Sequence, residues 1–178
     1  MKKHIKQIFF VISGLAIAAI FFTLTKLDIA SAAKKDGKKF RDWTVTCSYA
    51  DQENKKLETC ALTQQIDIVQ DEKKQRAALF HIGYYGPKKE LRLVAILPLG
   101  VSLEAGTSIV SSKKFIAPGK YVTCLASGCQ SVAYVSEEDL KILLSNEESS
   151  MACMNLEGNQ ITFPLSTKGL KEGLNFIR

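Results

Sequence analysis

The placement of the cysteines constrains this chain more than any other feature of its sequence. All five lie downstream of an amino-terminal segment, residues 1–32, that has the pattern of a secretory signal peptide. Exported cysteines meet an oxidising compartment, where disulfides form and persist. We therefore expect structural disulfides here rather than catalytic thiols or metal ligands. The five residues are Cys47, Cys60, Cys124, Cys129 and Cys153.

Residues 1–32 contain the three parts of a signal peptide. A lysine-rich start precedes the uncharged run Ile8–Leu24, and Ala30-Ser31-Ala32 then supplies a small-x-small cleavage motif. We predict cleavage before Ala33 and export to the periplasm, the outer envelope or the medium. The apolar run also reaches the lower limit of the about 17–25 residues that span a bilayer. An uncleaved anchor is the alternative, and the only membrane contact we expect.

The rest of the chain fits one domain with a short extension in front of it. Residues 33–39 are polar and lysine-rich, which predicts a flexible basic tether, and residues 40–178 suffice for a single core.

Loss of the leader removes four lysines and one aspartate, so the net charge falls from +6 to +3. Lysine doublets remain in predicted loops, where they favour solubility and protect sheet edges. Their alternative role is a cationic surface for anionic glycans, lipid headgroups or an acidic partner; no nucleic-acid partner is expected.

Period-two alternation of apolar residues predicts a mainly β domain. Trp43, Val45, Cys47 and Tyr49 alternate with polar residues, and further strand candidates follow at short intervals. Leu91–Leu97 is apolar on both faces, so we expect it at the centre of a sheet and covered on both sides. The spacing favours an antiparallel β-sandwich or barrel-like domain with one or two short helices. The strand candidates are residues 43–49, 60–69, 77–85, 91–97, 101–103, 107–110, 114–116, 121–125, 130–135, 151–156 and 160–165.

Two short helices are expected near the carboxyl end. Ser136 precedes three acidic residues in a capping-box pattern, with leucines at helical spacing behind it. Ser166 is placed as the cap of a second helix, in which Leu170, Leu174 and Ile177 repeat at i, i+4 and i+7. Glycines in this segment weaken an isolated helix, so we expect packing to stabilise it.

Four of the cysteines form two pairs that are close in sequence. Cys47 and Cys60 flank a polar loop between adjacent strand candidates. Cys124 and Cys129 bracket a tight, glycine-containing turn. Four cysteines allow three pairings, and proximity along the chain favours these two. Cys153 is left over, and we interpret it as a buried free thiol, with an intermolecular disulfide or a reactive thiol as alternatives.

The chain shows no recognisable catalytic, cofactor or metal motif. His81, the one histidine after the leader, lies in an apolar strand and is interpreted as a hydrogen-bonded structural residue rather than a general base. Ser102 lies in the nearest candidate for a nucleophile elbow, which lacks the second glycine of that motif. The cysteine spacings C-x12-C and C-x4-C differ from those of zinc sites and of C-x-x-C redox motifs. We therefore expect no enzymatic activity and no cofactor.

An ordered set of motifs resembles a known family. It comprises Trp43–Cys47, Cys60, Pro98-Leu99-Gly100-Val101 with Leu103 and Gly106, Tyr121–Cys124, Gly128-Cys129, Phe163–Ser166 and Gly169-Leu170. Across these motifs the chain resembles the invasion-associated locus B family of exported alphaproteobacterial proteins. The resemblance implies a β-rich, sandwich-like domain of the cell envelope, with Cys47, Cys60, Cys124 and Cys129 as structural staples. It implies no catalytic residues, and Cys153 is not part of the pattern.

The resemblance also implies a link, in some pathogenic members, to entry into host cells such as erythrocytes. We therefore expect a non-enzymatic envelope protein that binds an unknown protein or host-surface partner. The alternative is a periplasmic chaperone-like or envelope-integrity factor without a direct role in invasion, because free-living bacteria also carry family members. An enzyme of unrecognised type would need a deep pocket containing His81 or Ser102. The oligomeric state is not predicted.

Mass spectrometry of the exported protein checks the export and disulfide predictions together. We expect the chain to begin at Ala33 and to contain two intramolecular disulfides, because the leader directs the cysteines to an oxidising compartment. Free thiols at all five cysteines would contradict the structural role that we assign to them.

Overall fold

The computed structural model describes residues 35–52, 55–70, 72–145 and 148–178. The predicted signal peptide, residues 1–32, and the first two residues of the predicted tether lie outside the described residues. From Asp36 to Arg178 the chain forms one compact unit. Within the described ranges, no helix has the length and apolar character needed to cross a membrane.

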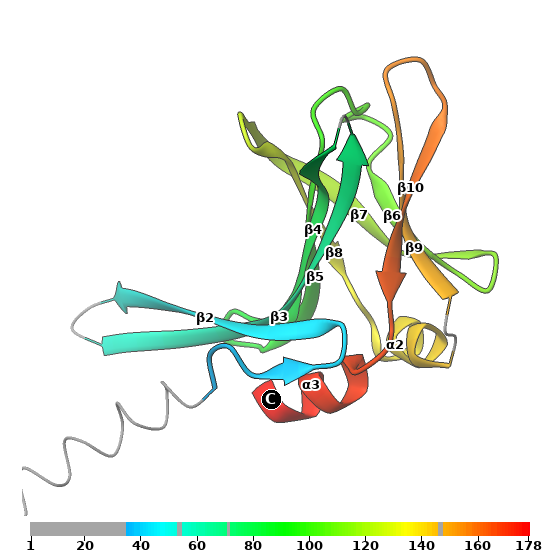
Figure 1. The fold of residues 1–178 in the computed structure, drawn as a ribbon. Helices are drawn as coiled ribbons and strands as arrows, with labels where there is room; N and C mark the ends of the chain where they lie inside the picture. The colour runs from blue at the N-terminus through cyan, green and yellow to red at the C-terminus, as the bar shows by residue number, and fades with distance from the viewer. Residues whose placement is uncertain (1–34, 53–54, 71, 146–147) are drawn as a thin grey trace, which may run out of the picture. The chain divides into compact units, whose positions relative to one another are not determined.

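Strands make up most of the described unit, with two short helices near its carboxyl end (Figure 1). This arrangement confirms the prediction of a mainly β domain with one or two short helices. The helices are α2 (Glu137–Leu144) and α3 (Leu170–Ile177). The strands are β1 (Lys39–Phe40), β2 (Trp43–Gln52), β3 (Lys55–Gln70), β4 (Lys73–Tyr85), β5 (Glu90–Leu97), β6 (Thr107–Ser111), β7 (Lys114–Leu125), β8 (Gly128–Tyr134), β9 (Glu148–Met154) and β10 (Gln160–Ser166).

All of these strands belong to one antiparallel sheet in the order β1-β2-β3-β4-β5-β8-β7-β6-β9-β10. Figure 1 shows that the sheet is strongly bent: β2 and the first part of β3 run across the base, whereas β4, β5 and β8 stand upright. The bend brings β10, at one end of the sheet, next to β3, near the other end. The domain is therefore a single curled sheet, which is neither two separate layers nor a closed barrel.

Alternation along the central strands places one row of apolar residues in the core. On β5, Leu91, Leu93, Ala95 and Leu97 are buried, whereas the residues between them are partly exposed. β5 lies between β4 and β8, which confirms its central position. The prediction that both faces of β5 are covered is wrong, because the curled sheet encloses its core on one face.

The sequence pattern predicts two strands, 114–116 and 121–125, with a break at residues 118–119. In the structure β7 runs through this break as one strand. The pairing of β6 with β7 changes register in this region, which leaves an extra residue on β7. Such a bulge accommodates Pro118, which has no amide proton for a regular ladder.

The predicted strand 101–103 is reduced to a single bridge between Val101 and Asn155.

The capping box predicted at the start of α2 is present. The Ser136 hydroxyl accepts a hydrogen bond from the Asp139 amide at 3.0 Å. In return, the Asp139 carboxylate accepts one from the Ser136 amide at 3.3 Å. The acidic first turn also suits the positive end of the helix dipole.

α3 begins after Gly169 and not at Ser166, so the predicted cap is wrong. Gly169 has a φ of 82° and lies so close to the Phe40 carbonyl that a Cβ would collide with it. One turn further on, a Cβ on Gly173 would lie 2.6 Å from a methyl group of Leu62. The glycines that weaken an isolated helix therefore allow α3 to approach β1 and β3 closely.

The described end of the predicted tether is hydrogen-bonded to β2. The Val45 amide donates to the Lys38 carbonyl, and the Cys47 amide donates to the Asp36 carboxylate, at 2.8 Å each. Lys39 already belongs to β1. Residues 36–39 of the predicted tether are thus hydrogen-bonded along the edge of β2.

Gly119 allows a buried hydrogen bond to pass across β7. It pairs with Thr107 of β6 on one side and with Ala133 of β8 on the other. The hydroxyl groups of Thr107 and Ser131 lie 2.5 Å apart, and both residues are buried. A Cβ on Gly119 would lie 2.4 Å from the Thr107 hydroxyl and 2.9 Å from that of Ser131. The missing side chain is therefore required for this contact.

Gly119→Ala is expected to lower the free energy of unfolding by roughly 1–3 kcal/mol, because the added methyl group overpacks the site and separates two buried hydroxyls. Urea denaturation measures the change. Lys120→Ala, at the next and exposed position of β7, serves as the control and should change stability little. Equal stability of Gly119→Ala and wild type would disprove this account of the glycine.

Candidate functional site

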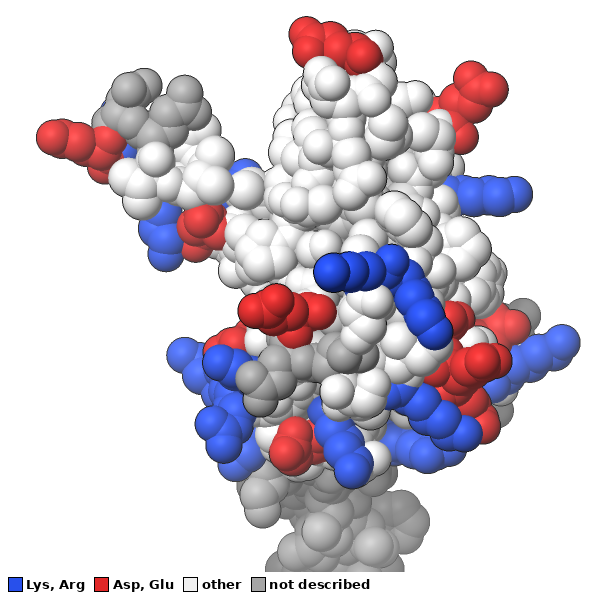
Figure 2. Space-filling model, turned by 90° about the vertical axis from the view of Figure 1, so that its right-hand side faces the viewer, with Lys and Arg blue, Asp and Glu red and all other residues white. Residues whose placement is uncertain are grey.

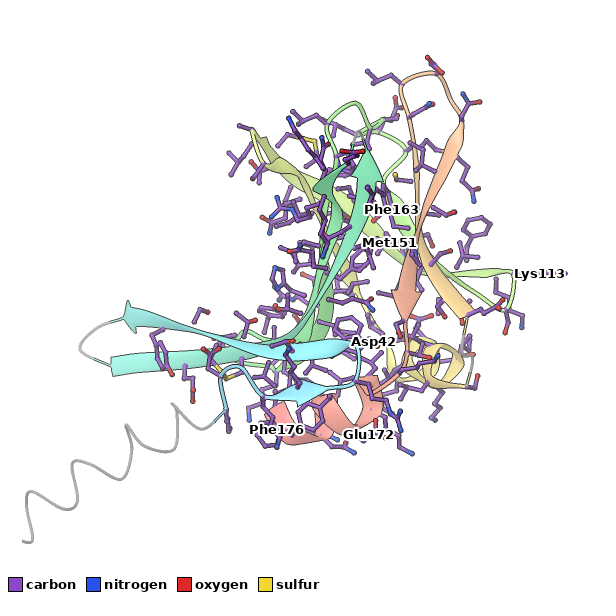
Figure 3. The ribbon with its side chains drawn as sticks, viewed as in Figure 1. Asp42, Lys113, Met151, Phe163, Glu172 and Phe176 are labelled. Atoms are coloured by element: carbon purple, nitrogen blue, oxygen red, sulfur yellow. A yellow bond between two sulfur atoms is a disulfide. The ribbon has the colours of Figure 1, made fainter. Side chains whose placement is uncertain are left out.

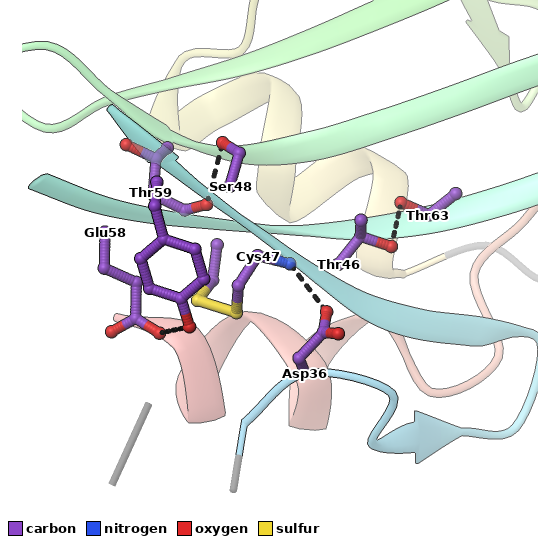
Figure 4. Close-up of a disulfide and its surroundings, with 9 residues drawn as sticks. Asp36, Thr46, Cys47, Ser48, Glu58, Thr59 and Thr63 are labelled. Carbon is purple, nitrogen blue, oxygen red and sulfur yellow. Dashed lines mark hydrogen bonds between the residues drawn. A yellow bond between two sulfur atoms is a disulfide. The ribbon is translucent and has the colours of Figure 1, made fainter. Parts of the chain in front are cut away.

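The first disulfide joins two facing residues of the β2–β3 hairpin. Cys47 and Cys60 are directly opposite in register, and their Cα atoms lie 4.0 Å apart. Figure 4 shows the bridge among polar cross-strand contacts, including a hydrogen bond from the Tyr49 hydroxyl to the Glu58 carboxylate. The disulfide lies where the hairpin leaves the core, since Tyr49 is already exposed. The disulfide therefore links β2 and β3 in a part of the hairpin that buries few apolar side chains.

The second disulfide has the same arrangement at the β7–β8 turn. Cys124 and Cys129 are also opposite in register, with Cα atoms 4.0 Å apart. Gly128 has a φ of 130° and lies against the Leu97 carbonyl, where a Cβ would collide. Both disulfides are the pairs that proximity along the chain favours.

The sulfur atoms of the first disulfide form the one candidate metal cluster within the described residues. Cys47, Glu58 and Cys60 bring potential ligand atoms within 4.8 Å of one another. However, the two sulfurs are bonded to each other, and a disulfide offers no thiolate to a metal. The oxidised site is therefore a structural bridge.

Cys153 is a free cysteine and is buried, as predicted from its neighbours. Burial raises the pKa of its thiol, while the nearby Tyr121 hydroxyl acts in the opposite direction. Burial and the nearby thiol in turn raise the pKa of the Tyr121 hydroxyl. Both groups are thus held in their neutral forms inside the sheet, and neutral Cys153 is a weak nucleophile.

His81 and Ser102 have separate hydrogen-bond partners. His81 Nδ1 lies 2.8 Å from the Thr63 hydroxyl, and burial together with the charge of Arg76 lowers the pKa of the imidazole. The Ser102 amide donates to the Met154 carbonyl at 2.8 Å. Neither His81 nor Ser102 lines the groove between β3 and β10 or the smaller cleft beside Cys153.

A groove of about 650 Å³ opens between β3 and β10. Gln64 and Ile66 of β3 line one side, and Thr162 and Pro164 of β10 line the other. It continues across β9 and β6 toward the β6–β7 turn at Lys113, which projects from the sheet (Figure 3). Acidic and basic residues both line it, so the groove carries no single sign of charge. The remaining lining residues are Asp42, Val110, Ser112, Glu148, Ser149, Ser150, Leu165, Ser166 and Lys168.

Hydrogen bonds to one residue close the groove at its base. The indole of Trp43 donates to the Ser166 carbonyl at 2.9 Å. The Ser166 amide donates to the side-chain carbonyl of buried Gln64 at 3.1 Å, and its hydroxyl donates to the Asp42 carboxylate at 2.6 Å. These bonds connect the end of β10 to β2 and β3 without a strand-to-strand ladder.

Three exposed leucines lie in the segments that the bridge between Val101 and Asn155 joins. The Leu156 amide donates to the Gly100 carbonyl at 3.2 Å, which holds residues 98–103 beside the end of β9. Leu99, Leu103 and Leu156 are 59%, 55% and 77% exposed. Figure 2 shows the face of the molecule on which β9 and β10 lie. Lys, Arg, Asp and Glu are concentrated in its lower part, whereas its upper part is largely uncharged. The described unit therefore displays apolar side chains on fixed loops.

Sequence reasoning missed both the groove and the leucine cluster. Trp43 and Ser166 are 123 positions apart, so no pattern within a short stretch of sequence predicts their contact. The proline at position 164 was the one usable signal, because proline within a strand indicates an edge. Leu99 and Leu103 belong to the sequence motif, whereas Leu156 does not, and the exposure of all three depends on the tertiary structure.

Two comparisons with known proteins return a match. The family model for the "Invasion associated locus B (IalB) protein" matches residues 43–178. The crystal structure of invasion associated protein B from Bartonella henselae is similar, with a TM-score of 0.63 and 14% sequence identity. The match covers 79% of this chain and 92% of that chain, and at this identity it shows the fold alone. No curated protein matches the chain.

The two disulfides should contribute unequally to stability, because they close loops of different length. Cys47 and Cys60 are 13 residues apart, whereas Cys124 and Cys129 are 5 apart. We expect Cys47→Ala to lower the free energy of unfolding by roughly 2–4 kcal/mol, and Cys124→Ala to lower it by less. Thermal and urea denaturation of both variants make the comparison. An unchanged melting curve for Cys47→Ala would count against a stabilising bridge at this position.

Proposed function

We propose that this chain, which belongs to the invasion associated locus B (IalB) family, is a non-enzymatic envelope protein that acts by binding a protein on the host-cell surface. The family model and the motifs agree over nearly the same residues, so the resemblance drawn from the sequence is confirmed. Membership and the two disulfides fit an exported protein. Partner binding and a role in erythrocyte entry are our proposal.

The exposed leucine cluster carries the proposal. Leu99, Leu103 and Leu156 belong to segments that a backbone bridge and further hydrogen bonds hold together. Fixed loops lose little conformational entropy on binding, which favours affinity. Apolar side chains grouped on a surface mark interaction sites more often than scattered ones do.

The surroundings of the cluster favour a protein partner over an anionic membrane. Glu104 and Glu157 are exposed and lie next to Leu103 and Leu156 in the chain. Carboxylates at these positions oppose insertion among anionic lipid headgroups. An apolar centre with a polar rim is instead the usual make-up of a protein interface.

Binding of the purified, oxidised protein to erythrocytes tests the proposal. We expect concentration-dependent, saturable binding by flow cytometry. The double variant Leu103→Asp/Leu156→Asp should lose roughly tenfold or more in apparent affinity, because it places charges in the centre of the contact. Val122→Asp/Leu125→Asp makes the same change at two exposed apolar positions of β7 and is the matched control, which should bind like wild type.

Thermal denaturation must show that both double variants fold. Absence of binding by wild type, or equal binding by both variants, would contradict the proposal. If a deletion strain instead becomes sensitive to detergent, and both variants restore resistance equally, the envelope-integrity function is favoured.

A further inference from the structure

Positive charge is concentrated in two short segments at the ends of the described unit. Residues 35–42 and 168–178 together contain seven lysines and arginines and three acidic residues, which gives a side-chain charge of +4. Residues 43–167, most of the domain, contain twelve lysines and arginines and fourteen acidic residues, a side-chain charge of −2. The mild basicity that remains after loss of the leader therefore belongs to these two segments.

The fold brings the two segments together. α3 contacts β1 and β2, and the rings of Phe40 and Phe176 lie 5.2 Å apart between centroids. A Cβ on Gly169 would lie 3.2 Å from the Cβ of Arg41, so the start of α3 lies against the turn after β1. Figure 1 shows β1 and α3 side by side at the base. We call the exposed cations of these segments the basic surface; they are Lys38, Lys39, Arg41, Lys168, Lys171 and Arg178.

The cations of the basic surface lack carboxylate partners. None of them forms a salt bridge with a described residue. The carboxylates of Asp36 and Asp42, which lie in the same segments, are bound instead by an amide and by a hydroxyl. Arg178 contacts an aromatic ring, with its guanidinium 5.9 Å from the ring centroid of Tyr84. The surface therefore offers its cations to an anion outside the described chain.

The lysines at the start of α3 are placed against the helix dipole. Lys168 precedes the helix, and Lys171 is its second residue. The positive end of the dipole favours acidic residues at such positions, and Glu172 is the one acidic residue of this turn. By contrast, the first turn of α2 contains three acidic residues. Helix stability therefore does not explain the two lysines.

The composition of the basic surface favours an anionic membrane over an acidic protein. Lysine is depleted at protein interfaces, whose centres are apolar. Clustered lysines and arginines near an exposed aromatic ring are instead typical of surfaces that bind anionic lipid headgroups. Phe176 supplies such a ring, since it is 37% exposed on the same helix as Lys171.

The chain enters the described unit beside the basic surface. Ten residues separate the uncharged run Ile8–Leu24 from Lys35, and ten residues span at most about 36 Å when fully extended. A leader that is still in the bilayer, during export or as an uncleaved anchor, therefore keeps this end of the domain close to the membrane.

We propose that the basic surface binds the headgroups of an anionic phospholipid bilayer, with α3 against the membrane. The loop between β9 and β10, which carries Leu156, lies at the opposite end of the unit from α3 (Figure 1). A domain bound through α3 therefore presents the leucine cluster away from the bilayer, where a partner can reach it. Membrane binding goes beyond the proposed function and does not depend on it.

Co-sedimentation with lipid vesicles tests the proposal on the mature, oxidised protein, which lacks the apolar leader. We expect binding to vesicles of equal parts phosphatidylglycerol and phosphatidylcholine, and none to pure phosphatidylcholine, because the attraction is electrostatic. Salt raised from about 0.1 M to about 1 M should release the protein, since the Debye length falls from about 10 Å to about 3 Å. Absence of binding to the anionic vesicles, or equal binding to both kinds, would overturn the proposal and favour an acidic protein as the partner.

Charge reversal at the start of α3 locates the binding surface. Lys168→Glu/Lys171→Glu should lower the vesicle partition coefficient roughly twentyfold or more, because each cation near an anionic membrane contributes about a fivefold factor. The variant should fold, since both glutamates suit the helix dipole. Lys114→Glu/Lys120→Glu makes the same change in net charge at two exposed positions of β7 and should bind like wild type. Equal loss of binding by the two variants would refute the basic surface as the site.

A fluorescent label reports which end of the domain touches the bilayer. Asn175→Cys places an environment-sensitive thiol dye on the exposed side of α3, and Leu156→Cys places it in the leucine cluster. The added thiol is the accessible one, because Cys153 is buried and the other cysteines form disulfides. Anionic vesicles should shift the emission to the blue at position 175 and leave it unchanged at position 156. Equal shifts, or a shift at position 156 alone, would contradict the proposed orientation. Erythrocyte binding uses the leucines at the other end, so the two proposals fail independently.

Discussion

Hydrogen bonds at Ser166 hold the curled sheet in shape, because they join its last strand to strands near its beginning. The Trp43 indole and the Gln64 amide bind the backbone of Ser166 in a place where β10 has no neighbouring strand. The concave face of a ten-stranded sheet is large, and two helices of eight residues each are too short to cover it. The sheet therefore buries much of its apolar face by bending over itself, and Ser166 lies where the bend closes.

The disulfides act where this core does not reach. Cys47–Cys60 lies where the β2–β3 hairpin leaves the core, and Cys124–Cys129 lies at the exposed end of β7. At such positions hydrogen bonds compete with water, and apolar burial contributes little. Covalent bridges between facing residues keep the register of these strands. The buried thiol of Cys153 needs no partner, because it packs as part of the core.

Two features of the surface lie on different elements of the fold. The leucine cluster lies on loops fixed by a bridge, whereas the basic surface lies on β1, α3 and the residues beside them. Apolar side chains on fixed loops suit recognition of a shaped protein surface. Exposed lysines and arginines suit attraction to an anionic membrane.

Local patterns in the sequence determined the class of the fold, the position of β5, the cap of α2 and the two disulfide pairs. Each of these depends on residues close in the chain: alternation along a strand, Ser136 with Asp139, or two cysteines around one turn. Tertiary structure decided the curl of the sheet, the start of α3 at Gly169, the one-sided burial of β5 and the meeting of β1 with α3 in the basic surface. These features arise from contacts such as Trp43 with Ser166 and Phe40 with Gly169, where residues more than a hundred positions apart meet. Periodicity reports which face of a strand is apolar, but the energy that selects a long-range partner depends on packing that no short window of sequence contains.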